Sequence, residues 1–148
     1  MNSFQIHVLL TCPTGAAQCL TRLREVLEPF ENIGETWPTV QNWERVLPTW
    51  FTSACAIPMS SDEAQASNER WRRMSQEERA ALAAKERWSL PDWLYWMEPE
   101  QSVWRWVDAT IKTPNELVVT LAVDGWPVAL GAFEWLARAA GADVVTVP

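Results

Sequence analysis

Two carboxylates that lie two positions apart, Glu98 and Glu100, are the side chains of this sequence best suited to acid–base chemistry. A pair of carboxylates can act as acid and base when their surroundings push the two pKa values apart. Nothing in the neighbouring residues, "WMEPEQS", is expected to raise one pKa above the other. We therefore predict that the protein is not an enzyme, and an enzyme that uses carboxylates alone is the weaker alternative.

The single histidine, His7, offers no second route to catalysis. It lies five positions before Cys12 on one predicted strand, so the two side chains point to opposite faces and cannot form a nucleophile–base pair there. No HExxH, CxxC or histidine cluster offers zinc ligands, and the five glycines form neither GxGxxG nor a phosphate-binding loop. We expect no metal and no cofactor. We also expect the three cysteines to be small buried hydrophobic residues.

Composition excludes several kinds of partner. The 148 residues have a net charge of −7, whereas binding to nucleic acid needs a basic surface. No apolar run is long enough to span a membrane, and the first residues, "MNSFQIHVLLTCPTG", predict a strand and a turn rather than a signal peptide. We therefore expect a cytoplasmic protein with one domain over residues 1–148. Its excess of acids lies mostly in residues 89–148, which hold eight acids and three bases.

The two ends of the chain show the patterns of an antiparallel sheet with helices. Apolar side chains alternate in the predicted strands, except in 117–123, whose continuous apolar run predicts a fully buried strand, and they recur every three or four positions in the predicted helices. The predicted strands are 3–12, 103–112, 117–123 and 142–147, and the predicted helices are 16–30 and 127–140. Pro127 would lie in the first turn of the last helix and Gly141 just past its end. This order predicts an α+β protein of the ferredoxin-like plan, with helices packed on one face of an antiparallel sheet.

Residues 31–102 form a tryptophan-rich insertion in this plan, and we predict that it is mainly helical. Ser60 with Glu63, and Ser75 with Glu78, have the spacing of capping boxes, which predicts two helices that are separated near Ser75. A further short helix follows at "SLPDWLYWM". Residues 31–59 are less clear: "TWPTVQNWERVL" suggests a short helix and "WFTSACAI" a short strand. An alternative α+β layout adds residues 50–57 to the sheet as a strand.

Strand parity predicts where the tryptophans of "WLYWMEPEQSVWRW" point. The odd positions of 103–112 end in apolar residues and form the natural core face. Trp104 and Trp106 then share the opposite face with Asp108 and point toward solvent. Together with Trp93 and Trp96 they would present about 600–1,000 Å² of ring surface, whereas the largest apolar patch of a typical monomer is about 300–600 Å². Either the inserted helices cover these rings by packing onto the sheet, or a partner protein does, and both can hold for different rings.

Aromatic side chains within an acidic rim are typical of a surface that binds a basic protein, because rings supply affinity and carboxylates speed association. The residues expected at this surface are Trp93, Trp96, Glu98, Glu100, Trp104, Trp106, Asp108, Asp124 and Trp126. An alternative is a ligand-binding or sensor domain that uses the same rings as a pocket for a sugar or an apolar metabolite. The sequence does not predict an oligomeric state.

In size, acidity and tryptophan-rich segments such as "PDWLYWMEPEQSVWRW" and "VDGWPVALGAFEWLARAAGA", the chain resembles the immunity proteins of bacterial polymorphic-toxin and type VI secretion systems. The resemblance is one of general type over the whole chain, and it transfers no site residue because no diagnostic motif is matched. It implies a protein that binds and neutralises a cognate toxin, for example a nuclease with a basic cleft.

Overall fold

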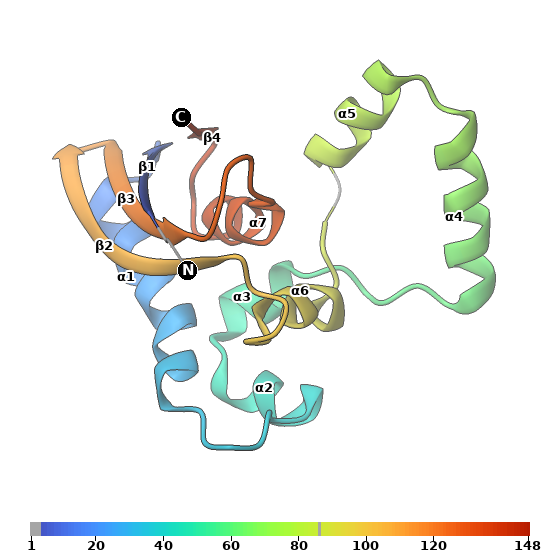
Figure 1. Cartoon of the computed structure of the whole chain (residues 1–148), viewed down its shortest axis with the longest axis horizontal. Helices are drawn as coiled ribbons and strands as arrows, with labels where there is room; N and C mark the ends of the chain where they lie inside the picture. Colours follow the sequence, from blue (N-terminus) through green and yellow to red (C-terminus); the bar gives the residue numbers. More distant parts are fainter. Residues whose placement is uncertain (1–3, 86) are drawn as a thin grey trace.

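Four antiparallel strands form one sheet in the order β2-β3-β1-β4 (Figure 1). The computed structural model describes residues 4–85 and 87–148. Its strands are β1 (Phe4–Thr11), β2 (Trp104–Thr113), β3 (Glu116–Val123) and β4 (Val144–Thr146). The predicted α+β class with an antiparallel sheet is confirmed. The first and last residues of all four strands lie within two residues of their predicted positions.

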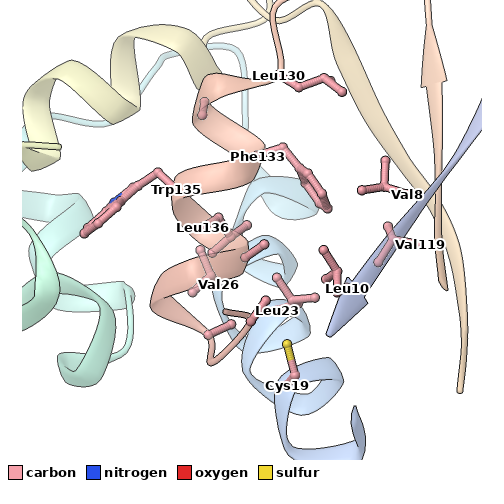
Figure 2. Close-up of a cluster of buried hydrophobic side chains, with 14 of the residues drawn as sticks. Val8, Leu10, Cys19, Leu23, Val26, Val119, Leu130, Phe133, Trp135 and Leu136 are labelled. Atoms are coloured by element: carbon pink, nitrogen blue, oxygen red, sulfur yellow. The ribbon is translucent and has the colours of Figure 1, made fainter. Parts of the chain in front are cut away.

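Two helices, α1 (Ala16–Leu27) and α7 (Gly131–Ala139), pack against one face of the sheet. Leu23 of α1 points toward Leu10 of β1, and Phe133 of α7 points toward Val8 (Figure 2). All four side chains are fully buried. The buried residues of α1 recur every three or four positions, which is the pattern that predicted this helix. The opposite face of β1 carries the exposed His7, whose Nδ1 lies 3.0 Å from Oγ1 of Thr120.

The last helix begins later than predicted, at Gly131 rather than at residue 127. Pro127 lies before it, in the connection from β3, where its peptide bond with Trp126 is cis. Leu130 is buried just before the helix, and its first residue, Gly131, packs closely on Trp88, since a Cβ there would lie 3.1 Å from the Trp88 ring. The helix ends as predicted, because Gly141 follows it with a φ of 120°, a conformation that favours glycine.

The described chain between α1 and β2 is mainly helical, as predicted. It contains a short 3-10 helix, η1 (Glu28–Asn32), and five α-helices: α2 (Val40–Val46), α3 (Thr49–Ala54), α4 (Ser61–Arg73), α5 (Gln76–Lys85) and α6 (Leu90–Met97). The short helix expected in "TWPTVQNWERVL" is present as α2. The side chain of Thr39 caps it by accepting a hydrogen bond from the N–H of Asn42, the third residue of α2.

The strand suggested by "WFTSACAI", and with it the alternative strand over residues 50–57, is wrong because this segment forms α3. The N–H groups of Phe51 and Thr52 both donate to the carbonyl of Pro48, at 3.0 and 3.1 Å, and bonds over three and four residues close a helical turn rather than pair a strand. Strand-like pairing in this region is a single parallel bridge between Ala56 and Ser89.

Helices α4 and α5, together called the arm, project from the rest of the molecule (Figure 1). Both predicted capping boxes are formed: Oγ of Ser60 accepts from the N–H of Glu63 at 3.2 Å, and Oγ of Ser75 accepts from the N–H of Glu78 at 3.1 Å. In each pair the glutamate carboxylate accepts from the serine N–H in return. Within α4, all of whose residues are described, no side chain is buried.

The arm is braced by a side chain of α5. Nε of Arg79 donates to the carbonyl of Trp71 at 2.8 Å, and its guanidinium carbon lies 5.5 Å from the centre of the Trp71 ring. A cation near the last carbonyls of a helix stabilises that helix end. The two arm helices therefore keep a defined arrangement although α4 buries no side chain.

Candidate functional site

Trp104 belongs to the core and not to a docking surface. It is 4% exposed, and its ring meets the ring of Phe133 in α7 edge to face, with centroids 5.3 Å apart. Trp106 is half-buried and packs against the same core. The prediction that Trp104 and Trp106 project away from the interior is therefore wrong.

A β-bulge in β2 is the reason for this error. Trp106 is paired with Leu121 of β3, but Asp108 is paired with the preceding residue, Thr120, so Val107 is an extra residue in β2. Side chains before a bulge are out of phase with those after it. Strict alternation over the whole strand consequently assigned both tryptophans to the wrong face.

Trp106 lies at a small hollow next to the first helix. The hollow has a volume of about 260 Å³ and is lined by Arg24, Leu27, Glu28 and Glu31 in addition to Trp106. These residues belong to α1 and η1, so the tryptophan side chain packs under the end of the first helix.

Trp93 is also inaccessible to a partner, because it is fully buried. Its Nε1 donates a hydrogen bond of 3.0 Å to the carbonyl of Ala132 in α7, and its ring lies 4.7 Å from the ring of Phe51 in α3. Trp93 thereby joins α6 and α3 to α7. The sequence suggested that tryptophans could hold the insertion onto the sheet. Trp93 does join the insertion to the rest of the fold, but it contacts α7 instead.

The predicted acidic residues do not form one rim. Asp124 is paired with Arg105 at 3.5 Å, and Asp108 is exposed on β2, where its carboxylate accepts from the next backbone N–H at 2.8 Å. Glu98 and Glu100 follow α6, the first half-buried and the second exposed. The acids are thus spread over the sheet and over the connection from α6 to β2.

Trp96 and Trp126 are the predicted tryptophans that remain exposed, by 40% and 48%. Trp126 lies in the connection between β3 and α7. Trp96 lies on α6, at a cleft between α6 and the arm. Of the nine predicted residues, Trp96 lines this cleft.

The arm cleft, as we call it, has a volume of about 520 Å³. Its walls are α4, residues 56–59, and residues 87–96. Four large apolar side chains line it while exposed to solvent: Ile57 (90%), Met59 (52%), Tyr95 (48%) and Trp96 (40%). Two small residues of α4, Ala64 and Ser67, face them from the arm. The arm cleft therefore brings together exposed apolar side chains from two separate segments, residues 57–59 and α6.

Helix α6 presents its two rings because its opposite side is fixed in the core. Leu90, Trp93 and Leu94 are buried at helical spacing, which leaves Tyr95 and Trp96 toward the cleft. These two rings meet edge to face with centroids 5.3 Å apart. The side chain of Ser89 caps the helix start by accepting a hydrogen bond from the N–H of Asp92.

One backbone hydrogen bond and the side chain of Arg87 join the two segments at the base of the arm. The N–H of Ala56 donates to the carbonyl of Trp88 at 2.8 Å. The guanidinium of Arg87 donates to the carbonyl oxygens of Ala54 at 2.9 Å and Cys55 at 3.0 Å, at the end of α3. The segments that enter and leave the arm are therefore joined side by side.

Sequence reasoning missed Ile57, Met59 and Tyr95. A usable signal was present for Met59, which lies between the predicted strand over residues 50–57 and the capping box at Ser60, whereas Ile57 was assigned to that strand. Apolar residues outside any periodic segment have no core face to join. Tyr95 gave no such signal, because the face it occupies depends on how α6 packs.

The arm and the rest of the chain differ in net charge. Residues 60–88 contain six acids and six bases, so the net charge of −7 comes entirely from the remaining residues. The arm cleft is lined by one charged residue of each sign, Arg87 and Asp92.

The described residues show buried thiols and no metal-binding cluster. Burial raises the pKa of Cys12 and Cys55, and it raises the pKa of Cys19 to about 12, so all three thiols stay protonated at neutral pH. Within residues 4–85 and 87–148, no group of three or more His, Cys, Asp or Glu side chains could hold a metal ion.

No protein-family model, curated protein or solved structure matches this chain. Among the helices in the described ranges, none is both long enough and apolar enough to cross a membrane.

Proposed function

We propose that the protein is a binding inhibitor, an immunity protein that neutralises a cognate bacterial toxin in the cytoplasm by direct contact at the arm cleft. One observation carries the proposal: Ile57, Met59, Tyr95 and Trp96 converge on one cleft and are 40–90% exposed. We assign the protein no catalytic role, no cofactor and no nucleic-acid partner.

Exposed rings in a cleft are favourable anchors for a protein partner. If each aromatic side chain has about 150–250 Å² of surface, the exposed parts of Tyr95 and Trp96 amount to about 150–200 Å². Ile57 and Met59 add to this apolar surface from residues 56–59, which line the same cleft. Interface energy concentrates in aromatic anchors that fill concave, well-packed sites, so these residues are the expected hot spots.

Charge supports a basic toxin. The residues outside the arm carry all of the net charge of −7, and a field of this sign attracts a cationic partner and raises its rate of association. A nuclease whose active site must bind phosphate would have the required basic surface. Acidic residues of the inhibitor would then lie where the phosphates of the substrate otherwise bind.

We further propose that the fold follows the ferredoxin-like plan, with recognition assigned to its insertion. The strand and helix order agrees with that plan if α1 and α7 are its two helices. The arm cleft lies entirely within the segment inserted between α1 and β2. The sheet would then support the insertion, and the insertion would bind the toxin.

A ligand-binding domain is the second candidate, because the cleft volume of about 520 Å³ falls within the range of small-molecule sites, about 300–1,000 Å³. Saturable quenching of tryptophan fluorescence by a sugar or apolar metabolite, with no protein partner present, would favour this candidate. Loss of that quenching in Trp96→Ala would place the ligand in the arm cleft.

The first test is co-expression with the product of the adjacent gene. That neighbour should stop growth when expressed alone, and it should be harmless together with this protein. Copurification of the two proteins should accompany the rescue. A neighbour that is harmless alone, or one that stays lethal in the presence of this protein, would contradict the proposal.

The second test asks whether the arm cleft is the binding surface. Trp96→Ala should weaken toxin binding by at least about 2 kcal/mol, roughly thirty-fold in Kd. Ile57→Lys should have a similar effect, since it buries a charge in the interface. Trp126→Ala is the matched control, because that ring is equally exposed but lies outside the cleft. Equal losses for Trp96→Ala and Trp126→Ala would place the toxin elsewhere.

A further inference from the structure

Strand β2 forms a free edge of the sheet. It is the first strand in the order β2-β3-β1-β4, and in the described part of the chain no other strand pairs with its outer side (Figure 1). A free edge can pair with a strand of a second copy of the chain, because its outward N–H and C=O groups have no ladder partner. This edge is suited to such pairing, since β2 has ten residues, contains no proline, and exposes the apolar side chains of Val107 and Ile111.

The hydrogen bonds of β3 alternate between its two neighbouring strands. The N–H of Cys12, just after β1, donates to the carbonyl of Asn115, just before β3, at 2.7 Å. Every second residue pair of an antiparallel ladder exchanges such bonds, so the register directs the backbone groups of Leu117 and Val119 toward β1. The even-numbered residues of β3 therefore bond to β2.

The same alternation shows which backbone groups of β2 point outward. Asp108 and Thr110 are paired with even-numbered residues of β3 and bond to them, whereas Ala109 and Ile111 are paired with odd-numbered residues. The N–H and C=O groups of Ala109 and Ile111 consequently point to the free edge. One of these two outward N–H groups already has a partner, because Oδ1 of Asp108 accepts from the N–H of Ala109 at 2.8 Å.

We infer that Asp108 blocks the free edge of β2 against pairing with a second copy of the chain. Register shifts on both sides confine regular pairing to residues 108–111. A second copy would fit there antiparallel, with the Thr110 residues of the two copies opposite each other. Each copy would then donate from Ala109 and Ile111 to the other copy, and Asp108 occupies the first of these donors in both.

A carbonyl of the second copy would have to displace this carboxylate, and a hydrogen bond to an ionised acceptor is stronger than one to a neutral carbonyl. Pairing would also leave the displaced carboxylate beside the new strand. The inference does not depend on the proposed function, since β2 does not line the arm cleft.

Sedimentation equilibrium of the whole protein tests the inference. Asp108→Ala and Asp108→Val remove the acceptor, and they should tighten self-association at least about ten-fold relative to the unchanged protein. Asp108→Asn keeps a side-chain oxygen as acceptor, so it should stay within about two-fold. Asp62→Ala is the control for the lost negative charge, because Asp62 is exposed on the arm. Far-UV circular dichroism should show the same fold for each variant, since Asp108 is exposed.

Crosslinking locates the association. Residues 110 of the two copies would form a pair without mutual hydrogen bonds, whose Cα atoms lie about 4.5 Å apart, a separation that suits a disulfide. Thr110→Cys combined with Asp108→Ala should therefore form covalent dimers when glutathione disulfide is added. Two protein thiols are then oxidised to one disulfide, and the glutathione disulfide is reduced to two thiols. Lys112→Cys combined with Asp108→Ala is the control, because residue 112 is exposed on the same strand but would lie opposite residue 108.

Covalent dimers should form at least about ten-fold faster through Thr110→Cys when Asp108 is replaced by alanine than when Asp108 is present. The inference is overturned if Asp108→Ala and Asp108→Val associate no more tightly than the unchanged protein, or if Asp62→Ala associates as tightly as they do. Crosslinking through Thr110→Cys that is as fast with Asp108 present would show that the edge is open, and equal crosslinking through Lys112→Cys would place the contact elsewhere. Either result rejects the inference.

Discussion

Replacing Trp104 by alanine should destabilise the fold severely. The ring is 4% exposed, and it packs edge to face on Phe133 at 5.3 Å. Truncating a buried tryptophan to alanine removes apolar burial and leaves a cavity, at a cost of about 3–5 kcal/mol. The lost aromatic contact contributes about 0.5–1.5 kcal/mol beyond its buried area. For a chain of this length, 3–5 kcal/mol corresponds to a fall in Tm of roughly 6–20 °C.

Urea denaturation followed by far-UV circular dichroism measures this loss without depending on the fluorescence of the deleted ring. The midpoint should fall while the slope of unfolding free energy against urea stays unchanged, because the surface exposed on unfolding is almost the same. Trp96→Ala is the matched control, and it should change the free energy of unfolding by no more than about 0.5 kcal/mol.

The bulge in β2 and the burial of Trp104 depend on each other, so this measurement tests both. A loss below about 1 kcal/mol for Trp104→Ala would mean that the ring is accessible in solution. The pairing of β2 with β3 would then have to follow the strict alternation that the sequence suggests, with both tryptophans of β2 on the open face.

Three further predictions concern other parts of the molecule. Deleting Val107 should preserve a cooperative thermal transition seen by circular dichroism, because Trp106 and Asp108 would then pair with Leu121 and Thr120 in regular alternation and both halves of β2 would keep their faces; loss of the transition would contradict the assigned register. Burial raises the pKa of Cys19 to about 12, so its neutral thiol stabilises the fold fully below about pH 9. As the pH rises from about 9 toward 12, the free energy of unfolding should fall by about 1.4 kcal/mol per pH unit. Cys19→Ala should therefore flatten the fall in urea stability between pH 9 and pH 11, and an equally steep fall would refute the burial of this thiol. Hydrogen bonds from Ser75 lower the pKa of Glu78, so the capping of α5 should be complete above the ordinary glutamate range and be lost as the pH falls through the lowered pKa. Glu78→Gln should accelerate amide exchange in α5 and remove this pH dependence, whereas Glu77→Gln should do neither.

Much of the fold was predictable because its signals are local. Alternating residues predicted the strands, and periodic apolar residues predicted α1. The two serine–glutamate pairs predicted the starts of α4 and α5, since a capping box is formed by residues only three positions apart. These features depend on neighbours in the sequence and require no knowledge of the tertiary structure.

The errors arose where distant contacts decide the outcome. The single extra residue at Val107 reverses the facing of Trp104, and no local feature of "WRWVDAT" marks it. Helix α7 starts at Gly131, four residues after the predicted start at Pro127, and the sequence pattern around Pro127 did not indicate this. We predicted a surface with exposed aromatic rings and centred it on Trp104 and Trp106. The exposed rings at the arm cleft are instead Tyr95 and Trp96, whose direction depends on the packing of α6.

The hydrogen bond between Ala56 and Trp88 gives the projecting helices a closed base, since the chain leaves and re-enters the main body at adjacent points. Residues 57–87 can therefore be exchanged as a cassette: a short turn, or the corresponding stretch of another protein, could bridge this gap without altering the strands or the core beneath them. Such a layout keeps the strands and the core independent of changes in the projecting helices.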